Sequence, residues 1–121
     1  MQNGHNDLGR RVFLLAVSLH GEREKDEWLQ FLFNVCHLME MTPVHKPISY
    51  DYPVDGKGGT GYTIIQPITE SFLALDVWPD HGGAYLFICS CRAFDKTRVM
   101  DYLILHQRFA IVDAMESRLN L

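Results

Sequence analysis

The sequence predicts a two-layer α+β sandwich, in which a mostly antiparallel sheet carries two helices on one face. Three observations predict this fold. Several apolar segments have the length of a strand, two segments show the apolar spacing of an amphipathic helix, and short turns join the central strands. The elements follow in the order strand, helix, four strands, helix, strand, which favours one sheet with both helices packed against it.

The first part of the chain supplies a strand and a helix. Residues 1–9 are polar and are expected to form a flexible lead before a single domain at residues 10–121. Residues 11–19 are apolar, as expected of a buried strand, and Gly21 ends that strand. Residues 24–41 are expected to form a helix with acidic side chains in its first turns, where they complement the helix dipole. Its apolar stripe consists of Trp28, Phe31, Leu32, Val35 and Met39.

The second part supplies the remaining strands and another helix. Residues 42–52 contain prolines, which donate no ladder hydrogen bond, so an edge strand or extended connection is expected. The glycine-rich residues 54–61 are interpreted as a mobile loop that suits a lid. Strands are expected at residues 62–68, 71–78, 84–91 and 109–115, a turn at residues 79–83, and a helix at residues 96–108 capped by Asp95.

Both faces of the central strands are apolar. Two helices cover only one face of a sheet, so we expect the other face to be buried against a second copy of the chain. In the predicted strand 71–78, one face carries Leu73, Leu75 and Val77, and the other carries Phe72, Ala74 and Trp78.

Composition excludes several kinds of partner. The 121 residues carry a formal charge of −4 without a basic run, so no nucleic-acid partner is expected. No apolar stretch approaches the length of a membrane helix, and three cysteines without disulfide spacing favour reduced thiols in the cytoplasm. No histidine has the spacing of a metal ligand relative to another histidine or to a cysteine pair, so no metal is expected.

One segment carries a resemblance to a known family. Residues 68–91 read ITESFLALDVWPDHGGAYLFICSC. They resemble the short, bacterial-type S-adenosylmethionine decarboxylases, which have Glu-Ser-His, a short apolar strand, His-Thr-Trp-Pro-Glu, and a strand ending at a cysteine. The spacing from Glu70 and Ser71 to Trp78 and Cys91 agrees without a gap. The start of the chain and the glycine-rich segment extend the likeness to nearly the whole sequence.

The resemblance implies the decarboxylase fold, a role in polyamine and spermidine synthesis, and cleavage of the chain between Glu70 and Ser71. In the family, the serine hydroxyl attacks the preceding carbonyl, and elimination leaves a pyruvoyl group on the new N-terminus. That group is the electron sink that decarboxylation of S-adenosylmethionine needs. By resemblance, Ser71 is the pyruvoyl precursor, Glu70 the new C-terminus and Cys91 the proton donor.

Two positions depart from the family pattern. Phe72 replaces the histidine after the serine, and Asp76 replaces the histidine that assists self-cleavage. An ionised carboxylate cannot donate a proton, and one placed among apolar neighbours needs a partner or a shifted pKa. Two alternatives therefore stay open. One is a pyruvoyl-free lyase, in which the substrate carboxylate displaces the sulfonium to give homoserine lactone and methylthioadenosine. The other is a non-catalytic ligand-binding relative.

These alternatives use overlapping residues. In a lyase, Glu70 and Asp76 would hold the sulfonium or ammonium, Tyr62 would contribute a hydroxyl, and the rings of Phe72 and Trp78 would face a cation or adenine. If the chain does not process itself, no cofactor is expected. The site is expected near a contact between copies of a homo-oligomer. The predicted catalytic residues are Glu70, Ser71, Asp76 and Cys91, and the predicted substrate contacts are Tyr62, Phe72 and Trp78.

Overall fold

The computed structural model describes residues 10–52 and 60–121. A one-turn 3₁₀ helix joins the fourth and fifth strands, and a π-helical turn continues the second helix. The predicted lead over residues 1–9 and most of the predicted glycine-rich loop lie outside the described residues. In chain order the elements are β1 (Arg11–His20), α1 (Lys25–Leu38), β2 (Ile48–Asp51), β3 (Tyr62–Ile68), β4 (Ser71–Trp78), η2 (Pro79–His81), β5 (Gly83–Ser90), α2 (Lys96–Asp101), η3 (Tyr102–His106) and β6 (Ala110–Asn120).

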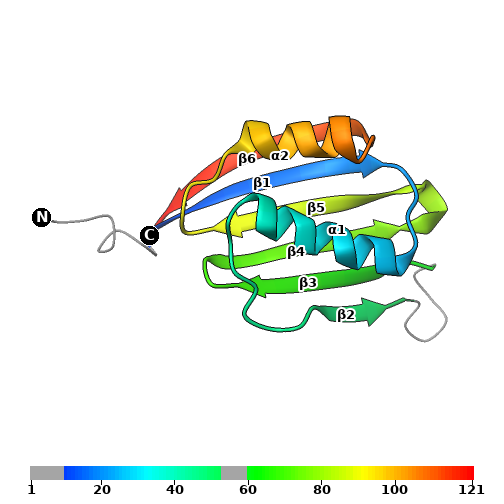
Figure 1. Ribbon diagram of the computed structural model, residues 1–121, viewed down its shortest axis with the longest axis horizontal. Helices are drawn as coiled ribbons and strands as arrows, with labels where there is room; N and C mark the ends of the chain where they lie inside the picture. The colour runs from blue at the N-terminus through cyan, green and yellow to red at the C-terminus, as the bar shows by residue number, and fades with distance from the viewer. Residues whose placement is uncertain (1–9, 53–59) are drawn as a thin grey trace, which may run out of the picture.

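The six strands form one sheet in the order β2-β3-β4-β5-β1-β6, and every neighbouring pair is antiparallel. Both helices lie on the same face of this sheet (Figure 1). The predicted two-layer sandwich and its order of elements are therefore confirmed. Consecutive strands β3, β4 and β5 lie side by side, whereas β1 enters between β5 and β6, so residues from both ends of the chain complete the sheet.

The core lies between the helices and the sheet. Trp28 on α1 is 1% exposed and stacks on Phe109, with ring centroids 5.4 Å apart. Leu73 and Leu75 on β4 are fully buried beneath the helices. Helix α1 begins with a capping box in which Glu27 accepts a hydrogen bond from the backbone of Glu24, and this satisfies an otherwise free N–H. The predicted cap of α2 is also present, because Asp95 accepts from the backbone N–H of Arg98.

The helix predicted at residues 24–41 ends at Leu38, and the one predicted at residues 96–108 is α-helical to Asp101 and π-helical to His106; two strand segments differ further. The last strand is predicted to end at residue 115, but β6 runs to Asn120 because its polar second half pairs along β1 as far as Arg11. Of residues 42–52, only Ile48–Asp51 form a regular strand, and this strand follows Pro47 at the edge of the sheet. Proline restricts pairing there in the predicted way.

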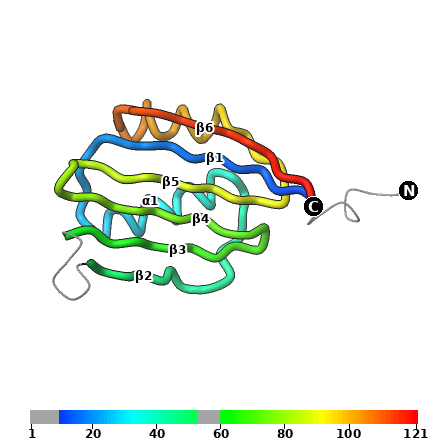
Figure 2. The backbone as a smooth tube through the Cα atoms, turned by 180° about the vertical axis from the view of Figure 1, so that it is seen from behind, coloured from blue at the N-terminus to red at the C-terminus, as the bar shows by residue number. Residues whose placement is uncertain are grey.

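The face of the sheet opposite the helices, here called the outer face, is covered by no described element (Figure 2). On β4, the side chains buried under the helices are Leu73, Leu75 and Val77, and those exposed on the outer face include Phe72 and Trp78. The predicted assignment of these side chains to the two faces is therefore confirmed. Large apolar side chains exposed on the outer face include Tyr50, Phe72, Trp78, Tyr85, Phe87, Met115 and Leu119.

Candidate functional site

The hairpin between β3 and β4 brings three of the predicted site residues together. Ile68 pairs with Ser71, so Thr69 and Glu70 form the two-residue turn. The carbonyl oxygen of Glu70 accepts a hydrogen bond of 2.9 Å from the backbone N–H of Cys91, just past the end of β5. The peptide bond between Glu70 and Ser71 therefore lies against the end of the neighbouring strand.

Ser71 has unusual backbone geometry and a sulfur partner. Its φ is 156°, a value that residues with a side chain rarely adopt. Its hydroxyl donates to the Sγ of Cys89 across a distance of 3.6 Å. Cys89 is buried and pairs with Phe72 across β4 and β5. Cys89 is not among the predicted site residues, although it stands only two residues before Cys91 in the sequence.

The carboxylate of Glu70 is held by a residue that no motif indicates. Its Oε2 lies 3.5 Å from Nη2 of Arg92, and the same guanidinium nitrogen donates to the carbonyl oxygen of Glu40 at 2.9 Å. The other oxygen, Oε1, is buried and has no hydrogen-bond partner among the described residues. Burial raises the pKa of the Cys36 thiol on α1 to about 11, and the charge of Glu70 adds to this rise. Glu70 thus directs its side chain toward the helices.

Asp76 lies away from Ser71 within one chain. Five residues separate them along β4, which corresponds to about 16 Å at the rise of an extended strand. The carboxylate of Asp76 accepts a hydrogen bond of 3.3 Å from Thr63, its cross-strand partner on β3. The expected proximity of Asp76 to Glu70, Ser71 and Cys91 is therefore absent within a single copy, because one strand carries both groups near opposite ends.

Asp76 instead borders a hollow of about 270 Å³ near the end of the sheet, and Trp78 and Tyr52 also line it. Gly61, another lining residue, permits the close approach of β3 and β4, because a Cβ there would lie 2.5 Å from the carbonyl oxygen of Val77. This hollow combines a carboxylate with two aromatic rings. Such a combination suits a cation or a planar ring system.

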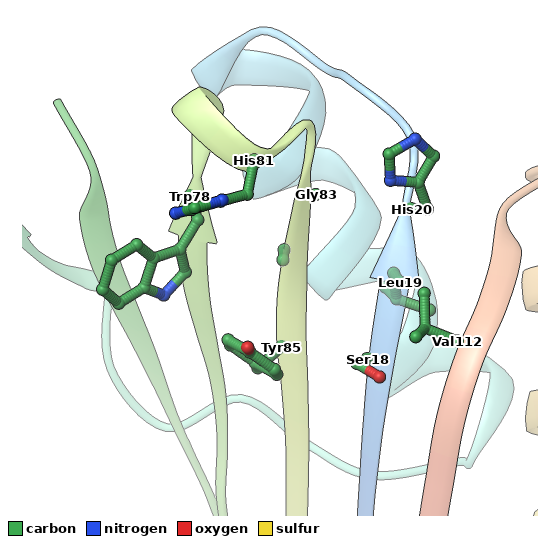
Figure 3. Close-up of a pocket in the computed structure, with 9 residues that line it drawn as sticks. Ser18, Leu19, His20, Trp78, His81, Gly83, Tyr85 and Val112 are labelled. Carbon is green, nitrogen blue, oxygen red and sulfur yellow. The ribbon is translucent and has the colours of Figure 1, made fainter.

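Trp78 also borders a second hollow of about 340 Å³ (Figure 3). The rings of Trp78 and His81 lie on one side, His20 lies on the other, and Tyr85 lies between them. The centroids of the Trp78 and His81 rings are 5.8 Å apart. Trp78 thus lines both hollows.

The other two predicted contact residues lie in different places. Phe72 follows Ser71 and is exposed on the outer face, 42% of its surface being accessible. Tyr62 lies opposite Val77, on the face that carries the helices, with the ammonium of Lys25 5.2 Å from its ring centroid. Burial raises the pKa of Tyr62. Tyr62 therefore does not share a face with Asp76.

Neither a metal cluster nor a membrane span is evident in the described part of the chain. Among residues 10–52 and 60–121, no three side chains of His, Cys, Asp or Glu are arranged to hold a metal ion. No helix within these ranges is long and apolar enough to cross a membrane.

Comparison with known proteins places this geometry in a family. Residues 23–117 match the family model of S-adenosylmethionine decarboxylase. The fold is similar to the crystal structure of the adenosylmethionine decarboxylase from Aquifex aeolicus VF5, with a TM-score of 0.62 and 19% sequence identity. That similarity covers 91% of this chain and 88% of the other. No curated protein matches the sequence. The family model spans most of the chain, and the chain belongs to the S-adenosylmethionine decarboxylase family.

Proposed function

We propose that this chain cleaves itself between Glu70 and Ser71 and then decarboxylates S-adenosylmethionine, in the cytoplasm and in the service of spermidine synthesis. The observation that carries the proposal is the hydrogen bond from the N–H of Cys91 to the carbonyl oxygen of Glu70. It places a fixed backbone donor on the carbonyl of the bond to be cut. The hydroxyl that would attack belongs to the next residue, Ser71.

The chemistry of cleavage follows from these contacts. As the Oγ of Ser71 bonds to the carbonyl carbon of Glu70, negative charge develops on the oxygen that the N–H of Cys91 already contacts. The bond from that carbon to the Ser71 nitrogen then breaks, the nitrogen takes up a proton, and an ester replaces the amide. Loss of the Ser71 α-proton then breaks the bond between its β-carbon and the ester oxygen, so that Glu70 leaves with a free carboxylate and the chain is cut. Water replaces the nitrogen of the remaining enamine, which leaves the pyruvoyl ketone and ammonia. The sulfur of Cys89 accepts the hydrogen bond of the attacking hydroxyl, so it lies where a proton acceptor is needed. The rare φ of Ser71 adds strain that cleavage would release.

The residues around Ser71 suit the group that cleavage would leave. A pyruvoyl group formed from Ser71 would supply the electron sink for decarboxylation. Phe72, the next residue, places its ring on the outer face, where a second copy of the chain would cover it and exclude water. Cys89 lies on the neighbouring strand β5 and Cys91 lies just past its end, and we assign proton donation to Cys91 as the family pattern implies.

A second copy of the chain is part of the proposal. The outer face is apolar, and stacking two such faces buries them about 10 Å apart. A two-fold axis between the stacked faces, crossing β4 near its middle, would bring the Asp76 end of one copy over the Ser71 end of its partner. The separation of about 16 Å within one chain would then be bridged between chains. We therefore propose a homo-oligomer whose site is completed at the outer face.

The pyruvoyl-free lyase is the second candidate, and the hollow at Asp76 favours it. The Asp76 carboxylate and the rings of Trp78 and Tyr52 line this hollow. A carboxylate and aromatic rings stabilise a sulfonium through charge and through the ring quadrupole. Positioning of the sulfonium would then be enough for the substrate carboxylate to displace it, without a cut at Ser71.

Product analysis separates these activities. The purified chain is incubated with S-adenosylmethionine, and the products are resolved by chromatography and mass spectrometry. Carbon dioxide with decarboxylated S-adenosylmethionine supports the proposal, and Ser71→Ala is expected to abolish both. Methylthioadenosine with homoserine lactone, unaffected by Ser71→Ala and lost in Asp76→Asn, supports the lyase instead. Unchanged substrate that nevertheless binds would contradict both and identify a binding protein.

A further inference from the structure

Strand β6 is a long edge strand whose protection against pairing is limited to one bulge near its start and a few charged side chains. It has 11 residues, and β1 is its only partner among the described strands. It contains no proline, and the single irregularity in its pairing lies near its start, opposite Ser18 and Leu19. The opposite edge of the sheet is different, because β2 has only 4 residues and follows Pro47. Natural sheets commonly protect their edges in the way β2 does.

The side chains of β6 alternate between two kinds of surface. Met115 and Leu119 lie on the outer face and are 67% and 59% exposed. Glu116 and Arg118 point to the helix side, since Glu116 pairs with the buried Leu15 on β1 and Arg118 lies two residues further on. From residue 115 onward the outer side of the edge therefore carries two apolar side chains around Ser117, and the helix side carries one acid and one base.

We propose that β6 pairs antiparallel with β6 of a second copy, about a two-fold axis at Ser117. An axis perpendicular to the sheet keeps every side chain on its own face. Residues that face each other in an antiparallel pair point to the same face of the sheet. Because side chains alternate along the strand, the axis must pass through a residue and not between two. Each possible centre on β6 therefore defines a different set of facing residues.

Charge selects among these centres. An axis at Glu116 sets two glutamates against each other, and an axis at Arg118 does the same with two arginines. An axis at Met115 leaves both charges facing uncharged residues. An axis at Ser117 sets Glu116 opposite Arg118 twice on the helix side, and Met115 opposite Leu119 twice on the outer face. Facing residues of opposite charge and facing apolar residues both stabilise antiparallel pairs.

The pairing would extend the six-stranded sheet across two copies of the chain. It is made through the backbone edge of β6 and takes only Met115 and Leu119 from the outer face, so the two contacts can be disrupted separately.

Cross-linking tests the position of the axis. In Ser117→Cys, the two new thiols face each other across the axis, and mild oxidation with diamide is expected to give a covalent dimer in high yield. In the control Asp113→Cys, the new thiol faces residue 121 of the other copy, so no such dimer should form above the level of the wild type. Equal cross-linking of the two variants, or none by Ser117→Cys, overturns the proposed register.

A charge exchange tests the energetics, in a Phe87→Ser background that removes the outer-face contact. Glu116→Arg and Arg118→Glu each set like charges opposite each other twice, so each should weaken the dimer at least about tenfold. The double variant restores opposite pairs and should return to within about threefold of its parent. Lys96→Ala is the control, because Glu116 also forms an ion pair with Lys96 within the chain, at 2.7 Å.

Sedimentation velocity gives the dissociation constants, and circular dichroism verifies that each variant is folded. The proposal is overturned if the Phe87→Ser parent is monomeric at about 100 micromolar, or if the single charge variants associate as tightly as that parent. Because none of these substitutions touches Glu70, Ser71 or Cys91, failure of this test leaves the proposed chemistry unaffected, and the reverse also holds.

Discussion

Removal of one aromatic ring from the outer face should weaken assembly strongly. Phe87 lies mid-strand on β5, opposite Ala16 and Ala74, and is 42% exposed. A phenylalanine side chain offers about 200 Å² of surface, so about 85 Å² of this ring is open to burial by a partner. At about 25 cal/mol per Å², burial of that area contributes about 2 kcal/mol per copy. Phe87→Ser removes it twice across a two-fold contact, for a total of about 4 kcal/mol and an increase of about a thousandfold in the dissociation constant.

The assay is sedimentation velocity over a dilution series of wild type, Phe87→Ser and a matched control. The control is Phe33→Ser, because Phe33 is similarly exposed, at 55%, but lies on α1 in the helix layer. We expect the outer-face association step to weaken in Phe87→Ser and to stay unchanged in Phe33→Ser. If the two variants behave alike, or if Phe87→Ser assembles as tightly as the wild type, the outer face is not the contact and the reasoning is wrong.

Three further predictions concern the hairpin and its surroundings. Ser71→Ala should leave the chain uncut in gel electrophoresis under denaturing conditions, because no hydroxyl remains to attack Glu70, whereas wild type should give two fragments. Arg92→Ala should lower the free energy of unfolding in urea by about 1 kcal/mol, since Glu70 loses its partially exposed ion-pair partner; an unchanged midpoint would contradict this. The raised pKa of Cys36, about 11, means that the folded state resists its ionisation. Stability should therefore be fully present below pH 9 and fall as pH rises toward 11, with a smaller fall in Cys36→Ala if the thiol is responsible.

Local patterns predict most of the fold because local chemistry determines most of it. The stripe that contains Trp28 and Phe31 has helical spacing, and Asp95 stands where a helix cap is needed. The length of β6 is harder to predict, because residues 116–120 are mainly polar. They extend along β1 through backbone pairing over a long sequence separation, which residue composition does not reveal.

The candidate site is only partly predictable for a similar reason. Glu70, Ser71 and Cys91 come together because a two-residue turn and the next strand bring them there. Arg92 contacts Glu70 only through the packing of the hairpin against the end of α1, and no spacing in the sequence indicates that contact. Asp76 stands where the family pattern has a histidine, but a straight strand keeps it distant from Ser71. A sequence motif does not state whether its members meet within one chain or between two.

The most direct measurement of the self-cleavage claim is the intact mass of the purified wild-type chain, with Ser71→Ala measured beside it. We expect two wild-type fragments divided before residue 71, the second beginning with a pyruvoyl group, and a single species for the variant. A single wild-type species at 13.9 kDa, uncut like the variant, would contradict the claim.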